Sequence, residues 1–129
     1  MKKVLISLED RRLADVVKTA FKQFPGLAAF PVPPESLVDV LREGGYQAVV
    51  CDLHAGGAPA NEFLAEIRET APDVAILALV DQRQRERFNK VKMDFDIFSC
   101  LSLPLDPFEL GRRILRLESH LNHKTSVRR

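Results

Sequence analysis

Short apolar runs alternate along the chain with stretches in which apolar residues recur at helical spacing. The runs predict five strands, at residues 4–6, 27–32, 48–51, 74–80 and 97–103. After the first run, the apolar residues at positions 13, 16, 17, 20, 21 and 24 lie on one face of a helix. A helical pattern or composition follows each other run as well. This alternation predicts an α/β domain with right-handed crossovers, a parallel sheet, and helices on both faces of the sheet.

The last expected helix begins with a recognisable cap. Asp106, Pro107 and Glu109 are residue types preferred at the N-cap, the first and the third helical positions. Apolar residues then recur as far as Leu121, where we expect the helix and the domain, residues 1–121, to end. Residues 122–129 are mostly polar, and we expect them to form a frayed tail or the start of a linker.

Size and charge narrow the class of protein. A chain of 129 residues with 46% apolar residues forms one domain with a real core. The 19 basic and 18 acidic residues give a net charge of +1, which argues against a dedicated nucleic-acid-binding protein. Two cysteines, no export signal and no long apolar stretch predict a cytoplasmic protein without a membrane span.

The candidate chemistry lies where the expected strands end. In open parallel sheets the functional crevice is outside the carboxyl ends of the strands, near the point where the strand order reverses. The segments that reach this edge are residues 8–10, 52–57, 80–81 and 102–104.

Two of these segments carry a resemblance to a known family. The run from Tyr46 to Leu53, which ends in Cys51-Asp52-Leu53, and the run from Ser102 to Pro107 resemble the receiver domain of bacterial two-component response regulators. The resemblance covers the chain to about Leu121. It implies a flavodoxin-like three-layer sandwich with strand order 2-1-3-4-5 and five helices. It also implies a non-enzymatic role in bacterial signalling or transcription control.

The resemblance assigns roles to three acidic residues. Asp52 stands at the position of the phosphoacceptor aspartate, and Glu9 at that of one acid of the Mg²⁺-binding pair. Leu8 replaces the other acid, and Asp10 follows as a substitute candidate. With one acid missing, we expect no required cofactor and weak or no Mg²⁺ binding at Glu9, Asp10 and Asp52. The alternative for Glu9 and Asp10 is that they only stabilise the N-terminus of the first helix.

The residues that work the family's switch are replaced. Val80 stands for the hydroxyl residue, Leu103 for the lysine, Cys100 for the aromatic residue and Gly56 for a proline. Val80 cannot donate a hydrogen bond to a phosphoryl oxygen, and Leu103 cannot pair with its charge. The sequence therefore resembles a degenerate receiver, or pseudo-receiver. The resemblance also implies a cis peptide bond between Leu103 and Pro104.

Other residues that invite a functional interpretation also have a simpler one. A metal site at His54, or at His120 with His123, is the weaker alternative to solvated histidines. Gly56 and Gly57 suit a flexible loop better than a phosphate cradle. Cys51 and Cys100 lie on strands that the topology separates by another strand, so we expect two buried thiols and no disulfide.

The resemblance also implies where partners bind. In this family the usual partner surface combines the fourth helix, the last strand and the last helix. Its candidate residues are Arg83, Arg87, Lys90 and Arg113. Leu110, Ile114, Leu117 and Leu121 follow the spacing of a heptad seam, which suits either the core or a homodimer.

Three functions remain open at this point. The first is a phosphorylation-independent interaction module that binds a protein partner or an attached output domain. The second is an atypical receiver, phosphorylated on Asp52 with Mg²⁺. The third is a flavodoxin-like module for a small ligand, although residues 8–11 contain no glycine to approach a phosphate.

Overall fold

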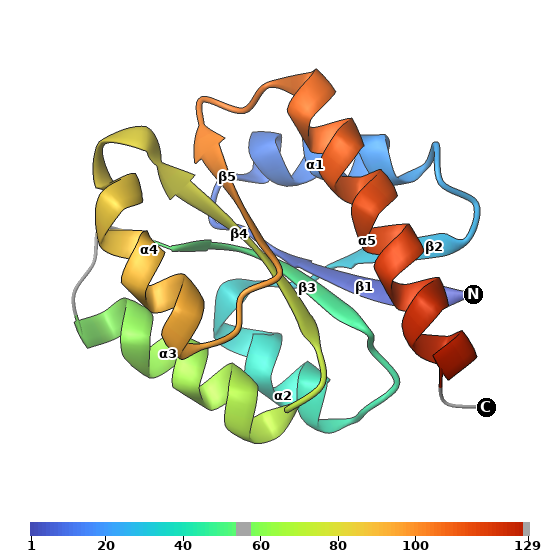
Figure 1. Ribbon diagram of the computed structural model, residues 1–129, viewed down its shortest axis with the longest axis horizontal. Coiled ribbons are helices and arrows are strands. Elements are labelled where there is room, and N and C mark those ends of the chain that lie inside the picture. Colours follow the sequence, from blue (N-terminus) through green and yellow to red (C-terminus); the bar gives the residue numbers. More distant parts are fainter. Residues whose placement is uncertain (54–57, 128–129) are drawn as a thin grey trace.

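A five-stranded parallel sheet forms the centre of the molecule, with helices on both faces (Figure 1). The computed structural model describes residues 1–53 and 58–127; for residues 58–60, 84, 87, 90, 91 and 124–127 it describes the backbone alone. The strand order is β2-β1-β3-β4-β5, which confirms the predicted flavodoxin-like architecture. The strands are β1 Lys2–Ser7, β2 Leu27–Pro31, β3 Ala48–Leu53, β4 Ala75–Asp81 and β5 Ser99–Leu103. The helices are α1 Arg11–Phe21, α2 Leu37–Arg42, α3 Ala58–Thr70, α4 Arg85–Asp94 and α5 Pro107–Val127, with 3-10 turns at Pro34–Ser36 and Gln82–Gln84.

Each face of the sheet has its own core. Helices α1 and α5 cover one face, and α2, α3 and α4 cover the other (Figure 1). Alternate residues of a strand therefore enter different cores: Ile6 packs with α1 and α5, whereas Leu5 packs with α2 and α3. Strand β4 lies between β3 and β5, and its residues 75–80 are all buried. This explains why it is the longest apolar run in the sequence.

Helix α5 differs from the prediction in length. It continues past Leu121 to Val127, so residues 122–127 are helical rather than a frayed tail; residues 128 and 129 lie outside the described part. Its apolar stripe is fully committed to the core, because Leu110, Ile114, Leu117 and Leu121 are all buried against α1 and the sheet. The core interpretation of the heptad-like spacing is confirmed, and the seam is not available to a second chain.

The side chain of Arg68, near the end of α3, connects three neighbouring segments through hydrogen bonds. The guanidinium of Arg68 donates to four carbonyl oxygens: Phe95 at 2.7 Å, Pro72 at 3.1 Å, Val74 at 2.6 Å and Asp96 at 2.9 Å. Partial burial lowers its pKa from the ordinary arginine value. The side chain thus links the end of α3, the start of β4 and the turn before β5.

No helix in the described part of the chain combines the length and the apolar character needed to cross a membrane.

Candidate functional site

Asp52 lies at the carboxyl edge of the sheet and is the penultimate residue of β3. It is half-buried, and its Oδ2 accepts a hydrogen bond from the backbone N–H of Glu9 at 3.3 Å. Strand β3 lies between β1 and β4, which is where the strand order reverses. The structure therefore places Asp52 beside the β1–α1 turn, at the edge of the sheet where the sequence predicts the functional site.

The other two acids of the predicted metal site have different environments. Asp10 is the N-cap of α1, and its Oδ1 accepts from the backbone N–H groups of Arg12 at 2.9 Å and Leu13 at 3.4 Å. This confirms the alternative interpretation of Asp10 as a helix-stabilising residue. Glu9 is exposed, and Leu8 is buried in the core under α1. Among the described residues, no three acidic, histidine or cysteine side chains converge on a metal-sized position.

The register of the sheet corrects one assignment at the end of β4. Asp52 pairs with Leu79, and paired residues of neighbouring strands point to the same face. Val80 therefore points to the opposite face, where it is fully buried in the core under α3 and α4. The residue of β4 that shares the face of Asp52 at the crevice is Asp81, not Val80. The sequence could not show this, because the register depends on where the two strands begin to pair.

Asp81 brings a carboxylate, not a hydroxyl, to this face. Its oxygens accept from the backbone N–H of Arg83 at 2.9 Å and from the Arg83 guanidinium at 3.2 Å. These hydrogen bonds lower the pKa of Asp81 below its ordinary value. Leu103 pairs with Asp81, and so it completes the same face with an apolar side chain that packs against the α1–α5 core. The ends of β3, β4 and β5 thus present two acids and a leucine on this face of the sheet.

The turn after β5 follows the prediction. The peptide bond between Leu103 and Pro104 is cis. Asp106 caps α5, accepting from the backbone N–H of Phe108 at 2.9 Å, and Pro107 is the first helical residue.

The two cysteines are buried thiols, as predicted. Cys51 and Cys100 are both free, and each pairs in register with Ala78 of the strand between them. Burial, with the nearby Asp52 carboxylate, raises the pKa of Cys51 to about 12. Burial also raises the pKa of Cys100. Neither thiol carries the charge of a reactive thiolate near neutral pH.

The predicted partner surface is only partly available. Arg83 lies on the 3-10 turn before α4 rather than on the helix, and its exposed side chain is paired with Asp81. Arg113 is three-quarters buried: its guanidinium donates to Ser99 Oγ at 2.9 Å and lies 3.7 Å from a carboxylate oxygen of Glu109. The side chains of Arg87 and Lys90 lie outside the described part of the structure.

A hollow of about 560 Å³ concentrates positive charge between α4, β5 and α5. We call it the basic hollow, because all five titratable residues among those that line it are bases. The lining residues are Lys92, Phe98, Ser99, Arg113, Arg116, Ser119, His120 and His123. The ring of His120 packs on Phe98 with centroids 4.9 Å apart. Spacing along single helices did not reveal this cluster, because its bases come from α4 and α5 together.

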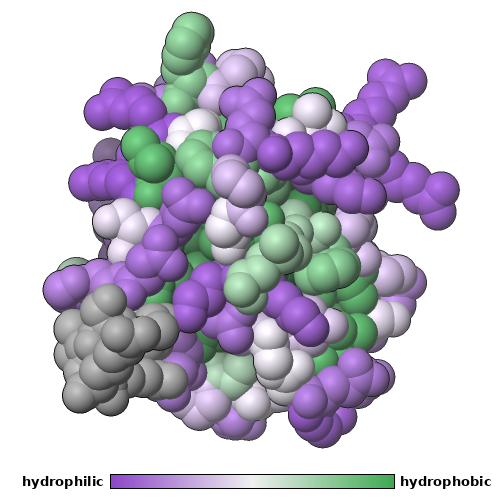
Figure 2. Space-filling view, turned by 90° about the vertical axis from the view of Figure 1, so that its right-hand side faces the viewer, coloured by the Kyte–Doolittle hydropathy of each residue, from purple (hydrophilic) through white to green (hydrophobic). Residues whose placement is uncertain are grey.

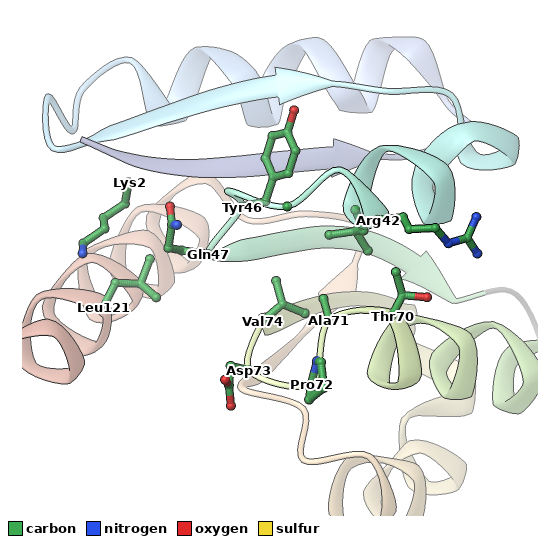
Figure 3. Close-up of a pocket in the computed structure, with 12 residues that line it drawn as sticks. Lys2, Arg42, Tyr46, Gln47, Thr70, Ala71, Pro72, Asp73, Val74 and Leu121 are labelled. Carbon is green, nitrogen blue, oxygen red and sulfur yellow. The ribbon is translucent and has the colours of Figure 1, made fainter. Parts of the chain in front are cut away.

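Two further hollows lie elsewhere on the described surface. One, of about 550 Å³, lies at the ends of β1 and β2, where its lining includes apolar residues such as Leu8 and Val32 and the charged residues Glu9, Arg11 and Glu35. The other, of about 390 Å³, lies at the amino ends of the strands, with Lys2, Gln47, Asp73 and Leu121 among its lining residues (Figure 3). The second lies at the opposite end of the strands from Asp52, and the Gln47 side chain in it bonds the backbone of Lys3. The predictions for His54, Gly56 and Gly57 fall outside the described residues.

Comparison with known proteins identifies the fold. No model of a known protein family matches the chain, and no curated protein matches it. Among solved structures it is similar to the receiver domain of AraT, a response regulator from Geobacillus stearothermophilus, at 13% identity and TM-score 0.79 over 96% of this chain and 98% of that one.

Two further matches widen the comparison. The receiver domain of RcsB from Salmonella enterica, solved with a beryllofluoride phosphomimetic, matches at 15% identity and TM-score 0.78 over 92% and 88% of the two chains. A protein described as one of a family of streptococcal redox sensors evolved from response regulators matches at 16% identity and TM-score 0.81, over 98% of this chain and 55% of that one. These likenesses show that the chain has the receiver fold.

Proposed function

We propose that the chain is a non-enzymatic regulatory module of the receiver type, which binds its partner without phosphorylation of Asp52. One observation carries the proposal: the strand ends that share the face of Asp52 bring Asp81 and Leu103 to it. A working receiver has a hydroxyl residue and a lysine in these roles. The loss of both groups supports a degenerate receiver.

A phosphoryl group on Asp52 would find little to hold it. It would carry a charge of about −1.5 to −2 at neutral pH. Asp81 contributes a carboxylate to the same face, and its arginine partner is exposed to solvent. A modification shifts a conformational equilibrium only through contacts that differ between the two states. With Leu103 in place of a lysine, and with Cys100 buried in place of an aromatic ring, few such contacts would form.

A Mg²⁺ ion at this site would also have few protein ligands. Glu9 and Asp52 supply carboxylate oxygens, but Asp10 is engaged as a helix cap and Leu8 is buried. We therefore expect weak or no Mg²⁺ binding, because the ion needs near-octahedral oxygen coordination. Calorimetry that shows tight Mg²⁺ binding, lost in Asp52→Asn, would contradict this part of the proposal and favour an atypical, phosphorylated receiver.

The partner would bind at the basic hollow. Its lining includes Lys92 and Arg116, and Ser99 and Glu109 hold the guanidinium of Arg113 in place. A fixed cation and an aromatic pair form a more specific contact than solvated surface charges do. We propose that the partner is a cytoplasmic protein or an attached output domain that presents an acidic surface here.

The test compares partner affinity with and without acetyl phosphate for wild type, Asp52→Asn, Arg116→Glu and Arg42→Glu. Arg42 is the matched control, an exposed arginine on α2 that pairs with Asp39 and is not among the residues that line the basic hollow. We expect Arg116→Glu to weaken binding, while Asp52→Asn, Arg42→Glu and the phosphodonor leave it nearly unchanged. A tenfold gain with the phosphodonor, about 1.4 kcal/mol of coupling, would overturn the proposal.

A second candidate function follows from the hollow beside Glu9. Its lining, which combines apolar Leu8 and Val32 with charged Glu9 and Arg11, and its place at the carboxyl ends of β1 and β2 suit a small ligand with an apolar part. Leu8 is central to this candidate, because it fills a position that is acidic in receivers. An apolar fluorescent probe whose binding to wild type is lost in Leu8→Asp would favour the candidate; equal binding to both proteins would exclude it.

A further inference from the structure

A row of four bases follows one flank of α5 and forms a wall of the basic hollow. The four are Arg113, Arg116, His120 and His123. Their spacing of three, four and three residues places them on one side of the helix. At a rise of about 1.5 Å per residue, the row extends for about 15 Å. On the face where α5 ends, apolar surface occurs in small areas between hydrophilic side chains (Figure 2). This part of α5 therefore suits a charged ligand better than an apolar one.

Acidic side chains compensate little of the charge of the hollow. Among the described residues, no carboxylate lines it, and Lys92 adds a further cation from α4. Glu109 lies 3.7 Å from Arg113 and also pairs with Arg112 at 3.3 Å, so one carboxylate serves two guanidinium groups. The positive field reaches the sheet: burial raises the pKa of the Cys100 thiol, whereas the charges of Lys92 and Arg113 act to lower it. The hollow therefore attracts anions.

One guanidinium in the hollow is held in place by the fold. The side chain of Arg113 is only 24% exposed, and its Nη1 donates to Ser99 Oγ at 2.9 Å. Ser99 is itself 3% exposed on β5, so the anchor does not move with the surface. A guanidinium has five N–H donors in a planar fork that matches the oxygens of a phosphate. Because the fork is already oriented, binding a phosphate costs little side-chain entropy at Arg113.

An exposed aromatic ring lies in the same row as these cations. The ring of His120 packs on Phe98 with centroids 4.9 Å apart and an interplanar angle of 39°. Phe98 is half-buried and packs against the α1–α5 core, so it supports the histidine ring from below, while His120 itself is exposed. Planar rings stack on such aromatic surfaces. A volume of about 560 Å³ is also in the range of sites for small organic ligands. The hollow thus combines a place for a planar ring with a place for phosphate.

We propose that the basic hollow binds a nucleoside diphosphate, with the phosphates at Arg113 and Arg116 and the base against His120. A diphosphate carries more negative charge than a single phosphate, which suits a site with three permanent cations, Lys92 being the third. This ligand goes beyond the proposed function, which places only a protein partner here. The nucleotide and that partner would exclude each other from the hollow, a consequence that rests on the proposed function.

Isothermal titration calorimetry of the full chain with ADP in Mg²⁺-free buffer tests the proposal, and pyrophosphate is the probe that lacks the base. ADP should bind saturably to wild type, at least about tenfold more tightly than pyrophosphate. Arg116→Gln should weaken ADP binding at least about tenfold, whereas Arg42→Gln, the same loss of charge outside the hollow, should change it by less than about twofold. His120→Phe should retain the preference for ADP over pyrophosphate and His120→Ala should lose it, because only the first keeps a ring.

Circular dichroism establishes that each variant is folded before its binding is measured. Wild type that binds no ADP would overturn the proposal. So would an Arg116→Gln variant that binds ADP as Arg42→Gln does, since the site would then lie elsewhere or depend on net charge alone. Equal affinity for ADP and pyrophosphate, or an unchanged preference in His120→Ala, would also overturn it, since the base would not be recognised. The experiment contains neither partner nor phosphodonor, so its failure is distinguishable from a failure of the proposed function.

Discussion

Replacing Val80 with threonine tests the corrected orientation of β4. The two side chains have nearly the same shape, so the change exchanges one buried methyl group for a hydroxyl. Val80 is 0% exposed and packs with Leu53 and Cys100 in the core under α3 and α4. A hydroxyl buried there without a hydrogen-bond partner costs about 1–3 kcal/mol in the free energy of unfolding.

Urea unfolding of wild type and Val80→Thr measures this cost. With a typical slope of about 1–3 kcal/mol per molar urea for a small domain, the midpoint should fall by about 1 M at an unchanged slope. Val16→Thr is the matched control, and its half-exposed site should change stability by less than about 0.5 kcal/mol. If Val80→Thr were as stable as wild type, its hydroxyl would have found a polar partner. Val80 would then face the crevice of Asp52, and the register argument would be refuted.

Three further predictions concern stability. Arg68→Lys should destabilise the fold by about 2–3 kcal/mol in urea unfolding, because one ammonium cannot bond the four carbonyls that the guanidinium serves; a loss below about 0.5 kcal/mol would contradict the role given to Arg68. Asp10→Ala should cost about 1 kcal/mol through loss of the α1 cap, whereas Asp10→Asn should cost much less; equal losses would show that the carboxylate charge matters instead. The raised pKa of Cys51 means that the unfolded chain loses its thiol proton first, so stability should fall as pH rises above the ordinary thiol value of 9.0; Cys51→Ala should show a shallower fall, and an identical fall would contradict the burial argument.

Much of the fold could be predicted because each of its determinants is local. The strand-to-helix alternation, the caps at Asp106 and Pro107, and the buried stripe of α5 are all visible within short windows of sequence. The prediction that α5 ends at Leu121 was wrong, because polar residues such as Asn122 and His123 can continue a helix as well as form a tail. Composition alone does not distinguish the two.

The site was harder to predict because its geometry is non-local. Asp52 was placed correctly, since a single strand delivers it to the edge of the sheet. Asp81, and not Val80, is the β4 residue on the face of Asp52 because of how β3 pairs with β4, and no short stretch of sequence contains that pairing. The same holds for Arg113, whose guanidinium bonds Ser99 on a different element. Arg68 was missed because its four carbonyl partners come from two separate turns.

The central claim is that Asp52 does not operate a switch, and amide NMR shifts test it most directly. The chain would be titrated with beryllofluoride and Mg²⁺, and the amides of Lys92, Ser99 and Arg113 would report on the face around the basic hollow. We predict that these three amides do not move, and that any changes stay at the ends of β1 and β3 near Asp52. Saturable shifts across Lys92, Ser99 and Arg113 that disappear in Asp52→Asn would contradict the account and show a working receiver.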